Sequence, residues 1–481
     1  MNDRQRPAPG GRAPRKQPGG GRSRTQRSAG PDPRRVAYDA VATVHRDDAY
    51  ANLVLPGLLR QARLERRDAA LVTELVYGTL RRRGTLDEIL AVAADRAVER
   101  IDPPARDALR LGAYQLLFTR IPPHAAVSAT VGLVRQVAPG ATGFANAVLR
   151  RVADQPLDDW LAQVAPPFDQ DPVGHLAVVH SHPQWIVRSF AEALGGDHGE
   201  TARLLAADNE PAPVHLCARP GRAEAVDLAD EVGGVPGAFS PYAVHLPAGS
   251  PPGELRALSD GRAHVQDEGS QLVAAALAEV PVAEGPAQRW LDMCAGPGGK
   301  AALLGGLAVQ QGAAVTAVEI AEHRARLVEQ AVHGLPVTVL RDDARSVGTG
   351  DELPAAGFDR VLVDAPCTGL GALRRRPEAR WRRQPGDLPA LTRLQRELLV
   401  AAIEAARPGG VVAYATCSPH VVETGVSVAE ARRRSPHRTE LLDAREFLPG
   451  MPGLGDGPTA QLWPHRHGTD AMFLAVLRRT A

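Results

Sequence analysis

The sequence has few cysteines, few aromatic residues and no long hydrophobic run, and each shortage excludes a class of protein. Of its 481 residues, four are cysteines and 4% are aromatic. The cysteines form no CxxC pair and no Cys/His cluster at zinc-finger spacing, which argues against a disulfide framework and against a structural metal. No apolar run reaches the ~18 residues that a membrane span requires, and no apolar segment follows the basic N-terminus as in a signal peptide. We therefore expect a cytoplasmic protein without a membrane anchor or a metal.

Lysine is also scarce, because Lys16 and Lys300 are the two lysines of the chain and arginine supplies nearly all its basic charge. Residues 1–35 contain nine Arg and one Lys against two Asp, with Gly, Pro, Ser and Gln between them. Such a segment has little to bury, so we expect residues 1–33 to form a disordered basic arm. The arm would either contact nucleic-acid phosphates or remain a solvated tail.

Helical periodicity dominates residues 34–155, which we expect to form an all-α domain. Apolar residues recur at helical spacing, for example at Val36, Val41 and Val44. Potential helix breakers, including Pro56-Gly57 and Gly84, fall between these runs. The pattern predicts a bundle of six or seven helices.

The rest of the chain mixes strands and helices. Residues 156–262 are rich in loops, and we expect a small α+β unit there, with a helix near residues 185–194. From residue 263 to 481, apolar strands alternate with amphipathic helices, which predicts a doubly wound α/β domain of the Rossmann-like type. The expected strands are 289–295, 314–320, 337–344, 359–366, 409–418 and 472–479.

Ligands of doubly wound sheets bind at the carboxyl ends of the strands, and the first three expected strands carry suitable groups there. The first is followed by the glycine-rich stretch CAGPGGK, residues 294–300, which has neither the spacing of a phosphate loop nor that of a dinucleotide loop. Glu319 ends the second strand, where its carboxylate could accept hydrogen bonds from both hydroxyls of a ribose. Asp342-Asp343 end the third strand, where a carboxylate could accept a hydrogen bond from an adenine amino group. Together they favour S-adenosylmethionine over NAD, although acidic residues at strand ends are also ordinary turn formers.

Two cysteines are expected at the same edge, Cys367 in DAPCTG and Cys417 in YATCS. A lone cysteine in an α/β core is usually an inert buried thiol, but two at neighbouring strand ends suggest chemistry on a pyrimidine. Addition of a thiolate to C6 of cytosine would make C5 nucleophilic enough to accept a methyl group. Asp364 could hold the cofactor or hydrogen-bond to the base, and the base would be presented in single-stranded or flipped RNA.

These residues resemble a known family. LDMCAGPGGK, VLVDAPCTGLG, YATCS and LWPHRHGTDAMFLAVL are similar to the motifs of RNA 5-methylcytosine methyltransferases. The helical stretches NLVLPGLL, LVTELVYGTLRRRGTLDEIL and GFANAVLRRV resemble the RNA-binding domain of the antitermination factor NusB. A fusion of the two resembles the Sun/Fmu group, the ribosomal RNA small subunit methyltransferase B type, over roughly residues 34–481.

The resemblance implies roles for individual residues. It makes Cys417 the nucleophile and gives Cys367 a part in product release, while a competing assignment uses Cys367, because DNA cytosine methyltransferases use the cysteine of a Pro-Cys pair. The implied cofactor contacts are Cys294, Ala295, Gly296, Pro297, Gly298, Gly299, Lys300, Glu319, Asp343 and Asp364. The chain departs from the family pattern in small-for-small changes at Gly296, Ala301, Thr368 and Ala471.

The resemblance therefore implies that the chain uses S-adenosylmethionine to methylate C5 of a cytosine in small-subunit (16S) ribosomal RNA. The RNA would be either free or part of a partly assembled subunit, and the reaction would pass through a covalent bond between a cysteine and C6. A tRNA substrate is the alternative within the same chemistry, and the NusB-like region favours rRNA. A non-catalytic RNA-binding assembly factor would not need both cysteines. A nicotinamide-dependent oxidoreductase would need the glycine fingerprint that the chain lacks.

Overall fold

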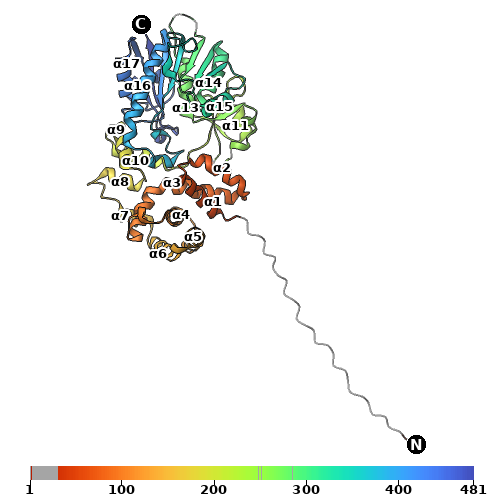
Figure 1. The fold of residues 1–481 in the computed structure, drawn as a ribbon, viewed down its shortest axis with the longest axis vertical. Coiled ribbons are helices and arrows are strands. Elements are labelled where there is room, and N and C mark those ends of the chain that lie inside the picture. Colours follow the sequence, from red (N-terminus) through yellow and green to blue (C-terminus); the bar gives the residue numbers. More distant parts are fainter. Residues whose placement is uncertain are drawn as a thin grey trace.

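The computed structural model describes residues 31–480, except 248, 251, 284 and 286, together with Asn2. A helical part from the first third of the chain lies at one end of the molecule, and an α/β part from the C-terminal half lies at the other (Figure 1). Most of the predicted basic arm, residues 1–33, lies outside the described residues. Within the described range, no helix combines the length and apolarity that would let it cross a bilayer.

Six helices form the N-terminal bundle, as the apolar spacing predicts. The first begins after Asp32, whose carboxylate accepts a hydrogen bond from the backbone N–H of Arg34 at 3.0 Å. Pro33 occupies the first turn, where its missing backbone N–H costs nothing because an N–H there has no partner within the helix. Leu86 and Ile89 are fully buried in the shared core. The helices are α1 (Pro33–Arg46), α2 (Ala51–Ala62), α3 (Arg66–Ala94), α4 (Pro103–Phe118), α5 (Pro123–Val137) and α6 (Thr142–Ala153), with short 3₁₀ turns η1 (Val98–Arg100) and η2 (Pro139–Ala141).

Two of the expected helix breaks are wrong. Pro56 lies inside α2, and Gly84 lies inside α3, which continues without interruption for 29 residues. A Cβ atom on Gly84 would lie 2.5 Å from Cη2 of Trp381, so the glycine lets an aromatic ring from a distant segment pack against the helix backbone. Tertiary packing therefore outweighs the helix-breaking tendency of glycine, which is only about 1 kcal/mol.

The middle region is more helical than its loop-rich sequence suggests. The expected helix near residues 185–194 is present as α9, and it is followed by a small antiparallel sheet in the order β2-β3-β1-β4. The helices here are α7 (Leu157–Val164), α8 (Pro172–Val179), α9 (Gln184–Ala193), α10 (His198–Ala207), α11 (Ala225–Val232) and α12 (Arg256–Ser259), with η3 (Pro252–Glu254). The strands are β1 (His215–Ala218), β2 (Val235–Pro236), β3 (Ala243–His245) and β4 (Ala263–Val265).

The C-terminal part is a doubly wound sheet in the order β10-β12-β9-β8-β5-β6-β7, with β11 paired to β12. The five strands β5 to β9 are parallel, and β12 runs antiparallel to β9. The strands are β5 (Arg289–Asp292), β6 (Ala314–Val318), β7 (Val337–Leu340), β8 (Phe358–Asp364), β9 (Ala406–Thr416), β10 (Thr439–Leu442), β11 (Ala460–Gln461) and β12 (Phe473–Arg479). All six expected strands are present. The short strands β10 and β11 were missed, because neither forms an apolar run.

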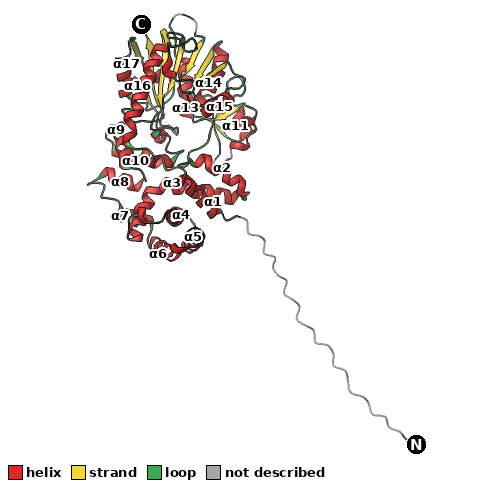
Figure 2. Ribbon diagram, in the orientation of Figure 1, coloured by secondary structure: helices red, strands yellow, loops and turns green. Residues whose placement is uncertain are grey.

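Helices cover both faces of this sheet (Figure 2). Neighbouring residues of β8 alternate between two cores: Leu362 packs with α13 and α14, whereas Val361 and Val363 pack with α16 and α17. This arrangement confirms the predicted α/β class. The helices are α13 (Glu268–Glu279), α14 (Gly299–Gln311), α15 (Glu322–Ala331), α16 (Leu388–Ala405), α17 (Gly425–Arg434) and α18 (Pro464–His467), with η4 (Ala344–Ser346), η5 (Leu370–Ala372), η6 (Pro377–Trp381), η7 (Pro385–Asp387) and η8 (Ala444–Phe447).

One segment, residues 374–383, joins the sheet to the helical part. Arg380 is fully buried, and its guanidinium donates hydrogen bonds to the carbonyl of Arg81 at 3.0 Å and to Oδ1 of Asn209 at 2.8 Å. Glu378 accepts a hydrogen bond from the backbone of Ala51 at 3.0 Å. Since this segment follows Cys367 in the chain, the loop that carries that cysteine continues directly into the contact with the bundle.

Candidate active site

The parallel strands bring the predicted site residues to one edge of the sheet. Residues 294–300 follow β5, Glu319 directly follows β6, Asp364 ends β8, and Cys417 directly follows β9. Cys367 lies three residues after the end of β8. The edge therefore has the place in the fold where doubly wound sheets bind ligands.

The two cysteines are in contact. The Sγ atoms of Cys367 and Cys417 lie 3.4 Å apart, and both side chains are only partly buried. The hydrogen bond to Cys417, together with burial, raises the pKa of the Cys367 thiol well above its usual range. Either sulfur can be the donor in this contact, so a proton can pass directly between the two thiols.

Lys300 places a positive charge beside this pair. Its Nζ donates hydrogen bonds to Oδ2 of Asp364 at 2.8 Å and to Oγ of Ser270 at 2.7 Å. Burial works against the charge, but attraction to Asp364 and to Cys417 outweighs it and raises the pKa of Lys300. The ammonium group is thus available to stabilise a negative charge on Cys417.

The glycine-rich loop closes around Glu319. The backbone N–H of Gly296 donates to Oε2 of Glu319 at 3.1 Å, and the N–H of Ala321 donates to Oε1 at 2.9 Å. A Cβ atom on Gly296 would lie 2.2 Å from that carboxylate, and Gly298 has a φ of +114°. Both glycines are needed for the loop to lie this close to the end of the next strand.

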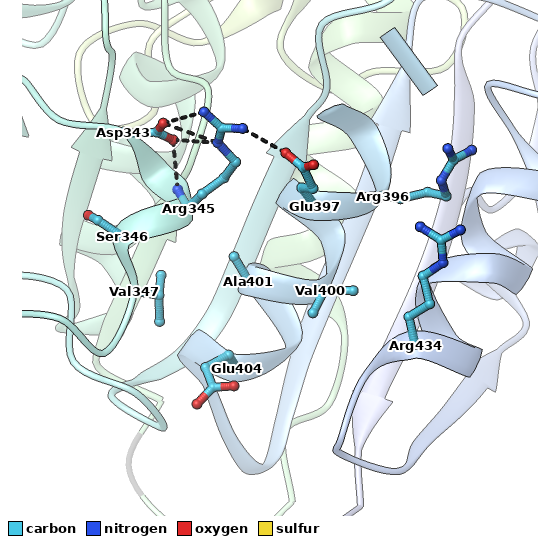
Figure 3. Close-up of a pocket in the computed structure, with 10 residues that line it drawn as sticks. All are labelled: Asp343, Arg345, Ser346, Val347, Arg396, Glu397, Val400, Ala401, Glu404 and Arg434. Carbon is cyan, nitrogen blue, oxygen red and sulfur yellow. Dashed lines mark hydrogen bonds and ion pairs between the residues drawn. The ribbon is translucent and has the colours of Figure 1, made fainter. Parts of the chain in front are cut away.

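The carboxylate of Asp343, which is expected to bind the adenine amino group, is already hydrogen-bonded to Arg345. Its carboxylate accepts hydrogen bonds from the backbone N–H of Arg345 at 3.0 Å and from Nη2 of that arginine at 2.6 Å, while Nη1 of Arg345 reaches Glu397 at 2.6 Å (Figure 3). These residues line a cavity of about 710 Å³ between residues 343–347 and the helices α16 and α17. Asp343 is the one predicted cofactor contact in that lining, so the cavity is separate from the glycine-rich loop.

Asp292 at the end of β5 was not selected from the sequence. It is fully buried, its Oδ1 accepts a hydrogen bond from the backbone of Cys294 at 3.3 Å, and its Oδ2 has no partner in the described structure. Burial and the nearby charge of Asp364 raise the pKa of Asp292 to about 7. An acidic residue at the end of an apolar strand, two residues before the glycine-rich stretch begins, was the signal that could have identified it.

Glu423 was also missed. This fully buried side chain lies between β9 and α17, and its carboxylate accepts hydrogen bonds from Thr368 and Ser418, the residues that follow the two cysteines. In the sequence it is a single acidic residue within an apolar stretch, VVETGVSV, and only the tertiary structure places it beneath the cysteine pair.

Nearly the whole chain is similar to known proteins. Residues 281–478 match the family model described as 16S rRNA methyltransferase RsmB/F, and residues 31–154 match that of the NusB family. A Mycobacterium tuberculosis (strain H37Rv) protein with a provisional methyltransferase name is 56% identical over 95% of this chain and 99% of its own length. Ribosomal RNA small subunit methyltransferase B of Escherichia coli O6:K15:H31 is 32% identical, with 92% of this chain and 98% of the relative covered.

Solved structures have the same fold. The crystal structure of PH0851 matches with a TM-score of 0.76 and 21% identity, covering 93% of this chain and 99% of the other. That of NSun6 from Pyrococcus horikoshii matches with a TM-score of 0.52 and 19% identity, covering 62% of this chain and 98% of the other. The first match extends over both the helical and the α/β parts.

Proposed function

The chain belongs to the family of 16S rRNA methyltransferases RsmB/F and carries a NusB domain, and from this premise we propose that it methylates C5 of a cytosine in 16S rRNA through a covalent cysteine intermediate. Methylation of rRNA with S-adenosylmethionine is the activity of the family. The choice of C5 and the covalent route are our proposals. The observation that carries them is the contact of the two cysteines at the carboxyl edge of the sheet, beside Lys300.

The residues at this edge fit S-adenosylmethionine. The unpartnered Oδ2 of buried Asp292 is an acceptor that suits the amino group of the methionyl part. Glu319 and Asp343 follow the next two strands; we assign Glu319 to the ribose hydroxyls and Asp343, whose carboxylate also accepts hydrogen bonds from Arg345, to the adenine amino group. Asp364 and residues 294–300 complete the proposed contacts. When bound, the cofactor supplies a methyl group on a positively charged sulfur.

Cys417 is the proposed nucleophile. Its sulfur forms a bond to C6 of cytosine, the electron pair of the C5–C6 double bond moves into the ring, and C5 becomes nucleophilic. After C5 has gained the methyl group, a solvent water molecule takes the C5 proton, the electron pair of the C5–H bond re-forms the C5–C6 double bond, and the Sγ–C6 bond breaks with its electrons leaving on Cys417. Lys300 stabilises the sulfur of Cys417 while it is negatively charged.

Cys367 then has a role in release. Because its sulfur lies 3.4 Å from that of Cys417, it can give its proton to Cys417 as that thiolate leaves C6. The alternative in which Cys367 is the nucleophile reverses the two roles, and trapping RNA adducts with each cysteine variant distinguishes the two assignments. Asp364 and Lys300, which are hydrogen-bonded to each other, are the proposed contacts to the edge of the base.

The substrate class is RNA with an unpaired target base. A cytosine inside a helix cannot present C6 to a sulfur atom, so the target must be single-stranded or flipped. The NusB domain supports rRNA, free or partly assembled, over tRNA.

The test is transfer of a labelled methyl group from S-adenosylmethionine to unmodified 16S rRNA and, in parallel, to unmodified tRNA, followed by bisulfite mapping. We expect label at one cytosine of the rRNA. Label only in tRNA would overturn the substrate, label on an atom other than C5 would overturn the chemistry, and no label in either the free RNA or assembling subunits would favour a non-catalytic assembly factor.

A further inference from the structure

Glu423 has an unusual set of partners for a buried carboxylate. Oε1 accepts hydrogen bonds from the backbone N–H of Thr368 at 2.8 Å and from Nε2 of Gln395 at 3.1 Å. Oε2 accepts hydrogen bonds from the hydroxyl of Ser418 at 2.6 Å and from that of Thr368. These four donors are neutral, so hydrogen bonds rather than an ion pair compensate for the burial of the group.

The donors come from both cysteine loops. Thr368 directly follows Cys367, and Ser418 directly follows Cys417. The two hydroxyl groups also lie 3.1 Å apart, above the same carboxylate. One carboxylate therefore connects two loops that are far apart in the sequence, at the residue next to each reactive sulfur.

Surrounding elements hold Glu423 in place. The phenol of Tyr414 on β9 donates to the backbone carbonyl of Glu423 at 2.8 Å. Gln395 on α16 donates to Glu423 and also to the carbonyl of Pro366 at 2.9 Å, just before Cys367. A side chain fixed in this way can fix its own partners in turn, because a satisfied buried network has little freedom to rearrange.

We propose that Glu423 is a positioning residue that sets the distance between the sulfur atoms of Cys367 and Cys417 by tying the loop after β8 to the loop after β9. This role deepens the proposed function and rests on it, because a fixed distance matters only if one sulfur passes a proton to the other. The positioning itself is a property of the protein without RNA or cofactor.

Substitutions of Glu423 separate positioning from simple stability. Glu423→Ala removes all four acceptor contacts. Glu423→Gln keeps the shape and one oxygen, and the serine and threonine hydroxyls can rotate to accept from its amide, so it should act as a partial rescue. Asp359→Asn is the matched control. Asp359 is a buried carboxylate at the opposite end of β8 that accepts a hydrogen bond from the backbone of Arg289 at 2.8 Å.

The distance between the sulfurs can be measured without catalysis. Diamide accepts two electrons and two protons from two thiols, so the rate at which it joins Cys367 to Cys417 in a disulfide, measured by peptide mass spectrometry, reports their proximity. We expect the wild type and Asp359→Asn to react at the same rate, Glu423→Ala to react at least about tenfold more slowly, and Glu423→Gln to lie between them. In methyl transfer, kcat of Glu423→Ala should fall by about 10- to 100-fold with KM for RNA nearly unchanged, because small misplacements of reacting groups have effects of this size.

An unchanged disulfide rate in Glu423→Ala would overturn the proposal, as would an unchanged kcat beside a slowed disulfide rate. If Glu423→Ala does not fold, Ser418→Ala and Thr368→Val each remove one hydroxyl donor, and equal disulfide rates in both and the wild type would overturn it too. If the wild type methylates no RNA, the proposed function fails, while the disulfide rates still decide whether Glu423 positions the pair.

Discussion

The Sγ atoms of Cys367 and Cys417 lie 3.4 Å apart although 50 residues separate them in the chain. The register of the parallel strands β8 and β9 explains the contact. Asp364 pairs with Ala415, and the backbone N–H of Ala365 still donates to the carbonyl of Ala415 at 2.9 Å. Cys367 lies two residues after Ala365, and Cys417 lies two residues after Ala415. The pairing of the two strands therefore brings the two thiols together.

Replacing each cysteine should affect the covalent intermediate in opposite ways. Cys417→Ala should form no denaturant-stable adduct with 16S rRNA, because the proposed nucleophile is gone. Cys367→Ala should accumulate an adduct, because the proton donor for release is gone. Both variants should lose turnover. The adduct is measured as labelled RNA that migrates with the protein in a denaturing gel.

Cys217→Ala is the control for this pair, because Cys217 is buried in the small sheet and far in the sequence from either loop. It should retain turnover and show no trapped adduct. An adduct formed by Cys417→Ala and not by Cys367→Ala would reverse the two roles.

Loss of the Glu319 charge should weaken cofactor binding. In Glu319→Gln, the side chain keeps its shape, but one of its two acceptor oxygens is replaced by an amide that repels the donors it meets. Hydrogen bonds to a charged group contribute about 1.5–3 kcal/mol, so Kd for S-adenosylmethionine should rise by roughly ten- to hundredfold in calorimetry. Glu329→Gln, an exposed change on the following helix, should leave Kd unchanged. Equal affinity of Glu319→Gln and the wild type would remove Glu319 from the site.

Sequence reasoning located the residues that depend on strand order and missed those that depend on tertiary contacts. Asp364 ends an apolar strand, and Lys300, Cys367 and Cys417 come after the ends of such strands. Parallel strands place these ends at one edge of the sheet whatever the loops do. Glu423 lies in a turn after β9, where a carboxylate has no distinguishing pattern. Its role depends on donors from segments 28 and 55 residues away.

Glycines in two helices of the bundle should respond oppositely to an added methyl group. Gly84→Ala would place its Cβ 2.5 Å from the ring of Trp381, which must move, and such overpacking typically costs about 1–3 kcal/mol. No described residue lies within 4 Å of a Cβ atom added to Gly132 in α5, so Gly132→Ala should stabilise the fold by about 0.5–1 kcal/mol through helix propensity. Thermal unfolding measures both. A stabilising Gly84→Ala would mean that Trp381 does not pack on α3.

The buried carboxylate of Asp208 should make stability depend on pH. Asp208 follows the last residue of α10, where a negative charge is unfavourable, and among the described residues neither of its carboxylate oxygens has a hydrogen-bond partner. Burial raises its pKa to about 7, although the charges of Arg380 and Arg374 oppose the shift. The adjacent His182, 3.6 Å away, cannot compensate because burial lowers its own pKa and keeps it neutral.

The sign of the effect follows from proton binding. Between the unfolded pKa of about 4 and the folded pKa of about 7, the native protein retains a proton that the unfolded chain has lost. The contribution of Asp208 to stability therefore falls as pH rises through this range and is constant above it. Asp208→Asn resembles the protonated form, so it should stabilise the protein more at pH 8 than at pH 5, by on the order of 2 kcal/mol, since each pKa unit corresponds to about 1.4 kcal/mol. Other groups titrate equally in variant and wild type, and the exposed change Asp169→Asn should show no such difference between the two pH values. The same gain at both pH values would mean that Asp208 is already ionised in the folded protein at pH 5, with a partner that compensates its charge.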